Sequence, residues 1–301
     1  MEIHQLQYVV QVAKYRHFTH AAEEICVAQS SLSQQITKLE TELGIKLFER
    51  TTRFVNPTPA GLEFVSYAKK ILAEIELSKQ CMQSHVGLTK GTLHIGAITT
   101  LESIGFVSLI TSFHNLFPGL YLDIAQNGSY HLTEKLNTSE IDVALLTPPE
   151  LDDDTDIVYY PLGDDEFVLV TANSSPIATK KVVNLTELAN ENFIFPSPDQ
   201  SIYKIYLKAC QDAGFTPTIV CQSSHSETSL ALVSDGMGIG FFPLGTLLAN
   251  ASAKVTIIKL AKPVKKHIAM ALLNRSHYSP AVAAFRDYVL ERYQNVMKIN
   301  K

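Results

Sequence analysis

The stretch Phe18–Arg53 reads FTHAAEEICVAQSSLSQQITKLETELGIKLFERTTR and predicts two helices joined by a tight connection. The first helix carries apolar residues at helical spacing up to Ile25. The second has an apolar stripe at i, i+4, i+7 and i+11, formed by Leu32, Ile36, Leu39 and Leu43. Its outer face consists of small hydroxyl and amide side chains, which can approach base edges and offer both donors and acceptors. The pattern is typical of a helix-turn-helix whose second helix enters the major groove of DNA.

The residues around this stretch predict a further helix and a short hairpin. Residues 3–15 have the apolar spacing of an amphipathic helix. Thr19 is the predicted N-cap of the helix that follows, and the longer helix is expected to begin near Gln29 or Ser30 and to end at Gly44 in a left-handed conformation. Extended residues near Val55 then predict a wing.

The charge of the chain restricts how it can bind nucleic acid. The net charge of the 301 residues is -5, and residues 1–90 hold 10 Lys/Arg against 9 Asp/Glu. Binding must therefore depend on a few placed side chains. We expect base contacts from the polar helix face and phosphate contacts from three cations. The base-reading candidates are Gln29, Ser30, Ser31, Ser33, Gln34 and Gln35, and the phosphate-binding candidates are Lys38, Arg50 and Arg53.

The run from Leu6 to Gly61 resembles the N-terminal domain of LysR-type transcriptional regulators. The landmarks occur in order over about 55 residues: the Ala21-Ala22 pair, VAQSSLSQQI, Leu39-Glu40, Leu43-Gly44, LFER at 47–50 and TPAG at 58–61. The sequence departs from the family where Ser30 replaces a frequent Pro and Gln34 replaces a frequent Arg. The resemblance implies a winged helix-turn-helix, a dimerising linker helix and a two-lobed domain like that of periplasmic binding proteins. It also implies promoter DNA, a small-molecule effector and further copies of the chain as partners, with RNA polymerase as a further candidate.

A long helix is predicted after Thr58, which is the expected N-cap with Pro59 in the first turn. Its apolar positions follow the 4-3-4-3-4 spacing of a coiled-coil seam, which is Phe64, Ala68, Ile71, Ile75, Ser78 and Met82. A lone helix would leave this seam exposed to water, so we expect it to pair with a second copy. The alternative is a helix that packs on its own chain.

From Leu93 onward the pattern changes to alternating strands and helices, which predicts mostly parallel sheets covered by helices. We expect a winged helix-turn-helix at 1–58, a linker helix at 59–88 and an effector-binding domain at 89–301. The family resemblance divides that domain into one lobe at 89–161 and 267–301 and a second at 162–266. The crossovers are expected near Pro161-Leu162 and Lys265-Lys266.

Ligands of α/β sheets bind beyond the carboxyl ends of strands and against helix N-termini. Several loops at such positions carry hydroxyls or free backbone N–H groups, which suit a small anion such as a carboxylate. The candidate effector-binding residues are Thr99, Thr100, Ser103, Gly128, Ser129, Thr147, Pro148, Ser197, Ser201, His225, Ser226 and Phe242. The alternative is that these hydroxyls only cap helices.

The remaining signals are weak. The four cysteines lack CxxC spacing, so we expect buried small hydrophobes, with a redox switch of Cys210 and Cys221 as the alternative. Gly236–Gly240 predicts a turn, and Asp152–Asp154 with Asp156 a solvated loop. No nucleophile–base group, metal site or cofactor motif is present in the sequence, which predicts no enzyme activity. With neither a signal peptide nor a membrane span, a cytoplasmic location is expected. The rival interpretations are a solute-binding protein and an enzyme that acts on a small carboxylate.

Overall fold

The structure is a computed structural model that describes all residues except 51–54, 85–90, 102–103, 149–155, 250–253 and 300–301. The chain divides into two compact units, one made chiefly of Met1–Gly87 and one made chiefly of the later residues. Each unit is described by itself. None of the described helices combines the length and the apolar character needed to cross a bilayer.

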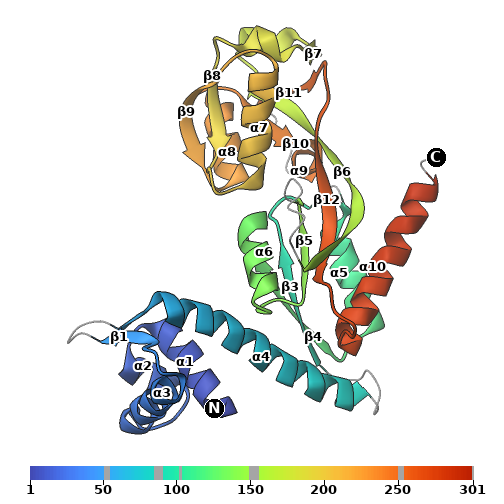
Figure 1. Cartoon of the computed structure of the whole chain (residues 1–301). Coiled ribbons are helices and arrows are strands. Elements are labelled where there is room, and N and C mark those ends of the chain that lie inside the picture. The colour runs from blue at the N-terminus through green and yellow to red at the C-terminus, as the bar shows by residue number, and fades with distance from the viewer. Residues whose placement is uncertain (51–54, 85–90, 102–103, 149–155, 250–253, 300–301) are drawn as a thin grey trace. The chain divides into compact units, whose positions relative to one another are not determined.

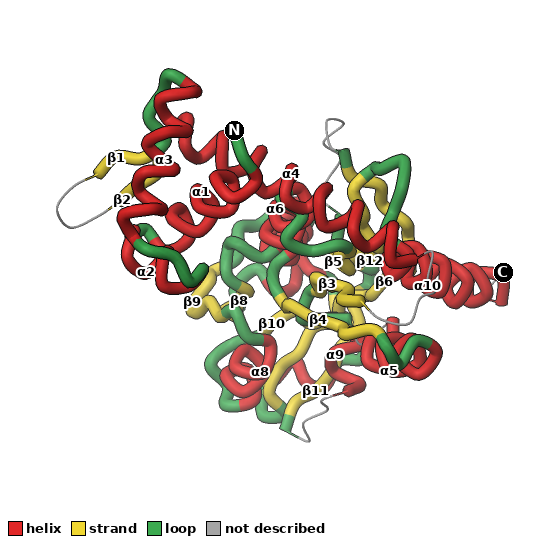
Figure 2. The backbone as a smooth tube through the Cα atoms, turned by 90° about the horizontal axis from the view of Figure 1, so that it is seen from below, coloured by secondary structure: helices red, strands yellow, loops and turns green. Residues whose placement is uncertain are grey.

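The first unit is a winged helix-turn-helix followed by a long helix (Figure 1). Its elements are α1 (Ile3–Tyr15), α2 (Phe18–Glu24), α3 (Gln29–Leu43), β1 (Phe48–Arg50), β2 (Val55–Pro57) and α4 (Pro59–Ser84). One face of each short helix contributes to a common apolar core, and the two short strands pair antiparallel as the wing (Figure 2). The predicted helix-turn-helix and hairpin are therefore confirmed.

The start of α2 corrects one prediction. The N-cap is His17, whose Nδ1 accepts a hydrogen bond from the Thr19 backbone N–H at 3.2 Å. Thr19 was the wrong residue because the helix begins early enough to bury Phe18, which is 8% exposed, in the core. The predicted left-handed end of α3 is confirmed, since Gly44 has φ +69°.

The turn into α4 explains the residues Thr58 to Gly61. The Thr58 hydroxyl accepts from the Gly61 N–H at 2.9 Å and donates to the Lys46 carbonyl at 2.8 Å, so Thr58 is the N-cap as predicted. A Cβ at Gly61 would lie 2.0 Å from the Leu47 carbonyl oxygen, so no other residue fits there without moving the backbone.

The predicted seam of α4 is covered unevenly within its own unit. Phe64 packs on the core of the helix-turn-helix and Ala68 is 1% exposed. Large apolar side chains further along the helix face solvent, among them Ile71 at 40% and Met82 at 65%. The start of the helix thus packs on its own chain, and the remainder presents the apolar surface that a second copy would cover.

The second unit is built on an eight-stranded sheet and a separate two-stranded parallel sheet. The large sheet has the order β4-β3-β5-β12-β6-β11-β7, with β10 also paired to β6. Its strands are β3 (Gly91–Ala97), β4 (Leu120–Gln126), β5 (Val143–Leu146), β6 (Ile157–Ala172), β7 (Val182–Val183), β10 (Gly240–Pro243), β11 (Val255–Leu260) and β12 (Val264–Leu273). The small sheet pairs β8 (Asn192–Pro196) with β9 (Thr218–Ser223).

The prediction of mostly parallel sheets is wrong for the middle of the large sheet. β12 pairs antiparallel with both β5 and β6, and β6 pairs antiparallel with β10 and β11. The cause is that β6 and β12 are the two crossovers and run between the lobes as continuous strands (Figure 1). The pairing skips Leu162 at a β-bulge, beside Pro161, which has no N–H for a ladder hydrogen bond.

Helices cover the sheets and mark the two lobes. The helices are α5 (Phe106–Leu116), α6 (Ser129–Asn137), α7 (Ser201–Asp212), α8 (Ser226–Ser234), α9 (Leu244–Ala249) and α10 (Pro280–Ile299), with 3-10 turns at Pro176–Thr179 and Leu185–Leu188. The last helix packs on the first lobe as predicted, because the ring of Phe285 lies edge-on to Phe113 at 4.9 Å and the Tyr293 hydroxyl donates to the Ile104 carbonyl. The second lobe has its own core around Phe193, Phe195 and Tyr206.

Candidate functional site

The predicted DNA-reading residues lie along α3. Gln29, Ser30, Ser31, Gln34 and Lys38 are exposed, as a surface that meets DNA requires.

The other two base-reading candidates, Ser33 and Gln35, are half-buried and already bonded within the unit. The Gln35 side-chain oxygen accepts from Gln5 Nε2 at 3.1 Å, and Gln5 is 1% exposed. The amide of Gln35 is therefore held by α1, while its neighbour Gln34 points outward.

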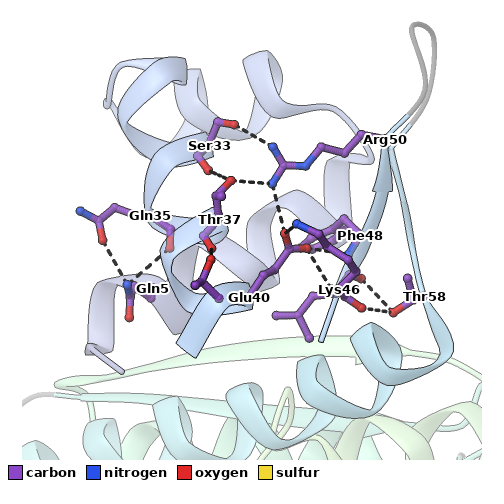
Figure 3. A network of polar contacts seen from close by, with 11 residues as sticks. Gln5, Ser33, Gln35, Thr37, Glu40, Lys46, Phe48, Arg50 and Thr58 are labelled. Carbon is purple, nitrogen blue, oxygen red and sulfur yellow. Dashed lines mark hydrogen bonds and ion pairs between the residues drawn. The ribbon is translucent and has the colours of Figure 1, made fainter. Parts of the chain in front are cut away.

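A polar network joins α3 to the wing (Figure 3). Glu40 is at its centre and is 2% exposed. Its Oε1 accepts from the backbone N–H groups of Leu47 and Phe48 at 2.9 and 3.2 Å, and its Oε2 lies 3.0 Å from Lys46 Nζ and 3.6 Å from Arg50. A buried carboxylate is tolerated when its lone pairs and charge are both matched, and here they are.

Arg50 belongs to the same network. Its guanidinium donates to Ser33 Oγ at 3.0 Å and Thr37 Oγ1 at 3.2 Å, and lies over the Phe18 ring at 4.7 Å from the centroid. The side chain of Arg50 is thus bonded to α3. Arg53, predicted beside it at the wing tip, lies outside the described residues.

Three of the predicted effector-binding residues meet between the lobes, two through their hydroxyls and one through its backbone N–H. Ser129 is the first residue of α6, and Ser201 is the first residue of α7 in the other lobe; their Oγ atoms are 3.3 Å apart. The Thr147 N–H donates to Ser129 Oγ at 3.2 Å. The Thr147 side chain is buried, at 6% exposed, and its hydroxyl has no hydrogen-bond partner among the described residues. Two helix N-termini and an unsatisfied hydroxyl form the kind of environment that binds a small anion.

A second cluster holds the predicted residue Thr100. Lys266 is fully buried, and its Nζ donates to the Thr100 carbonyl oxygen at 2.7 Å and hydroxyl at 2.6 Å. The Asp165 carboxylate lies 3.9 Å from the same ammonium, and its Oδ2 has no hydrogen-bond partner in the described part of the chain. Lys266 was predicted only as a crossover position, and Asp165 was not predicted. The signal in the sequence that could have revealed this pair is the presence of charged residues within two long, largely apolar strands.

An open groove of about 350 Å³ lies beside the first turn of α6. It is lined by Asn127, Gly128, Tyr130, His131 and Glu134 of the first lobe and by Asp199 of the second. Of these, only Gly128 was predicted. His131 Nδ1 lies 3.5 Å from the Glu134 carboxylate, so the lining of this groove includes an imidazole beside an acidic group, with Asp199 as a second acidic group.

The remaining predicted effector residues do not gather at one point. Ser197 Oγ lies 2.7 Å from Ser224 Oγ, whereas His225 is the N-cap of α8 and Ser226 its first residue. The side chain of Phe242 is packed in an apolar core and Thr99 is exposed.

The last two candidate effector-binding residues are Pro148 and Ser103. Pro148 is half-buried, and Ser103 lies outside the described residues.

The cysteines divide by environment. Cys210 is buried, and burial raises the pKa of its thiol to about 12, so it stays protonated and unreactive. This confirms the prediction of a buried small side chain for Cys210. Cys26 is exposed, which makes the same prediction wrong there because it follows the end of α2. Cys221 is half-buried, and the Cys81 side chain is outside the described part.

Comparison with known proteins agrees with this architecture over most of the chain. The LysR substrate binding domain family matches residues 87–294, and the bacterial regulatory helix-turn-helix protein, lysR family, matches residues 3–62. The chain belongs to the LysR family of transcriptional regulators. The resemblance noted in the sequence is therefore confirmed.

Individual relatives align over nearly their full lengths. The transcriptional dual regulator GltC of Bacillus subtilis (strain 168) is 29% identical, with 98% of this chain and 99% of the relative covered. The regulator CfxR of Cupriavidus necator is 30% identical, with coverage of 97% and 92%. Full-length OxyR from Pseudomonas aeruginosa superposes with a TM-score of 0.75 at 26% identity, with coverage of 96% and 95%. These relatives are regulators, which confirms that the chain is not an enzyme and disfavours the solute-binding interpretation.

Proposed function

We propose that this LysR-type regulator binds its effector between the two lobes, at the Ser129–Thr147–Ser201 cluster. The observation that carries the proposal is the buried Thr147 hydroxyl, which lacks a hydrogen-bond partner among the described residues. A buried polar group without a partner is destabilising, so a ligand or water that bonds to it stabilises the domain. The adjacent N-termini of α6 and α7 favour a negatively charged group there.

The effector we propose is a carboxylate that also carries a donor or a positive group. The inner cluster presents hydroxyls, backbone N–H groups and helix N-termini, which suit a carboxylate. The adjoining groove carries Glu134 and Asp199, which disfavour a second negative charge at its mouth and favour an ammonium or hydroxyl. A small amino-carboxylate fits both environments better than a dicarboxylate.

A thermal-shift series on the full chain tests this proposal. Alanine, succinate and alaninamide are compared at equal concentration, because ligands that bind the native state raise its apparent stability. We expect alanine, which has one carboxylate and one ammonium, to raise the melting temperature more than succinate, and alaninamide, which has no carboxylate, to have no effect. T147V and S129A should abolish the shift, whereas T111V, an exposed threonine of α5, should retain it. A shift that T147V and S129A leave intact would place the ligand elsewhere.

We further propose that the chain acts as a homodimer or homotetramer on a two-half-site promoter. The exposed apolar side chains of α4 support pairing, and a dimer matches two half-sites. The effector would act by binding one arrangement of the assembly more tightly than another. Footprinting on the promoter of the chain's own gene, with and without the ligand found above, tests this regulation. RNA polymerase stays a predicted partner, and its binding can be measured on the same promoter DNA.

A further inference from the structure

The Arg50 guanidinium donates hydrogen bonds to the recognition helix α3 of its own chain. One Nη donates to Ser33 Oγ and the other to Thr37 Oγ1, while Glu40 lies 3.6 Å away (Figure 3). The ring of Phe18 covers one face of the group at 4.7 Å. The side chain is 36% exposed, so most of it is already buried in the absence of DNA.

We propose that Arg50 is a positioning residue for DNA reading, which acts through α3 and Ser33 and is not chiefly a phosphate contact. Arg50 ends β1, so its bonds to Ser33 and Thr37 fix the wing against the recognition helix. The positioning role replaces the phosphate contact expected for Arg50 from the sequence. The proposal rests on the DNA-binding function of the family.

The bond from Arg50 also sets the hydrogen-bonding character of Ser33. A guanidinium has donors only, so Ser33 Oγ must accept from it. The Thr37 hydroxyl proton is already donated to the Ser33 carbonyl at 2.9 Å. In the described part of the chain, the Ser33 hydroxyl has no other hydrogen bond, so its own proton is left to donate. Ser33 therefore presents a donor, which requires an acceptor on the DNA such as purine N7, guanine O6, thymine O4 or a phosphate oxygen.

Lysine cannot reproduce this arrangement. The fork of arginine reaches two hydroxyls at once, whereas an ammonium is a point charge on a flexible stem. R50K therefore keeps the charge that a phosphate contact needs and removes the geometry that the positioning role needs.

The test measures specific and non-specific DNA binding across a salt series. The specific probe is a duplex that the wild-type full chain selects from a random-sequence pool, and the non-specific probe is a scrambled duplex of equal length. Each phosphate contact contributes about 0.9 to the slope of log K against log [salt]. We expect R50K and R50Q to keep the wild-type slope and to lower the specific-to-non-specific ratio about tenfold, the loss of one good base contact. K38Q, the control at an exposed cation of α3, should lose about 0.9 of the slope and keep the ratio.

Two variants of α3 keep the proposal testable if the Arg50 variants fold poorly. S33A and T37V should also lower the ratio at an unchanged slope, and 7-deaza-purine substitution should show whether purine N7 is the acceptor that Ser33 reads. The proposal is overturned if R50K binds like wild type while R50Q loses about 0.9 of the slope, or if S33A and T37V leave the ratio unchanged. If the wild-type chain selects no sequence at all, the DNA-binding function itself fails, which is a different result.

Discussion

Two buried ions, Glu40 in the winged helix-turn-helix and Lys266 in the effector-binding domain, are held very differently. Glu40 is 2% exposed and is matched by two backbone N–H groups and two cations. Lys266 is fully buried and is bonded to two oxygens of Thr100, but the Asp165 carboxylate 3.9 Å away keeps one oxygen without a hydrogen-bond partner in the described chain.

The two regions therefore differ in whether their buried polar groups have all their hydrogen-bond partners. The network around Glu40 leaves its polar groups satisfied, so the wing and recognition helix are set before DNA arrives. In the effector-binding domain, Asp165 Oδ2 and the Thr147 hydroxyl are buried and have no hydrogen-bond partner among the described residues. Groups of this kind favour a ligand or a rearrangement that supplies the missing partners.

The largest expected effect is at Glu40. E40A removes the acceptor for the Leu47 and Phe48 amides and leaves two cations without their shared partner. We expect the free energy of unfolding of the helix-turn-helix to fall by about 3–5 kcal/mol, as measured by urea unfolding of the full chain. E42A is the control, since Glu42 is exposed and pairs only with the N-terminus in the described structure; its effect should stay below about 0.5 kcal/mol. Equal effects of the two variants would show that the network does not stabilise the unit.

Lys266 gives the second prediction. K266M keeps the length of the side chain and leaves Asp165 as a buried charge without its cation, so we expect a loss of about 3 kcal/mol. The double variant K266M/D165N removes that charge and should recover part of the loss. Urea unfolding followed in the effector-binding domain measures both. If the double variant is as unstable as K266M, the Lys266–Asp165 interaction is not the cause.

Cys210 gives a smaller, pH-dependent effect. Burial raises the pKa of its thiol from 9.0 to about 12, so the folded state keeps the proton after the unfolded state has lost it. The stabilising contribution is present below pH 9 and declines as pH rises toward 12. We expect wild type to lose about 1 kcal/mol more than C210A between pH 8 and pH 10. Parallel unfolding curves of the two proteins over this range would contradict the raised pKa.

The smallest change in stability is expected at Thr147. T147V replaces a buried hydroxyl without a partner among the described residues by a methyl group of similar size. The stability should stay within about 0.5 kcal/mol of wild type, or rise slightly, because an unsatisfied polar group is removed. Thermal unfolding of the ligand-free chain measures it. A loss above about 2 kcal/mol would mean that the hydroxyl is bonded in solution, through water for example.

The sequence predicted elements better than it predicted contacts. The apolar stripe of α3, the Gly44 end and the Thr58 cap are local patterns, and all three are confirmed. The antiparallel pairing of β6 and β12 depends on residues about 100 positions apart, so local pattern could not reveal it.

The sites were limited in the same way. Ser129, Thr147 and Ser201 were predicted because each follows a strand or begins a helix, and the fold brings them together. Lys266 was missed as a partner of Thr100, because the two lie 166 residues apart. Arg50 was assigned to phosphate by its place beside the wing, since its bonds to Ser33 and Thr37 depend on tertiary packing.

Hydrogen exchange on the full chain compares the two regions in one measurement, because it reports local stability amide by amide. We expect the helix-turn-helix to be complete without ligand, and the space between the lobes to be completed by ligand. Without ligand, the Leu47 and Phe48 amides, which donate to buried Glu40, should exchange more slowly than the Thr147 amide, which donates to Ser129. Adding the carboxylate that gives the largest thermal shift should slow exchange at Thr147 and leave Leu47 and Phe48 unchanged. Equal protection at both places without ligand, or ligand-induced protection at Leu47 and Phe48 alone, would contradict the account.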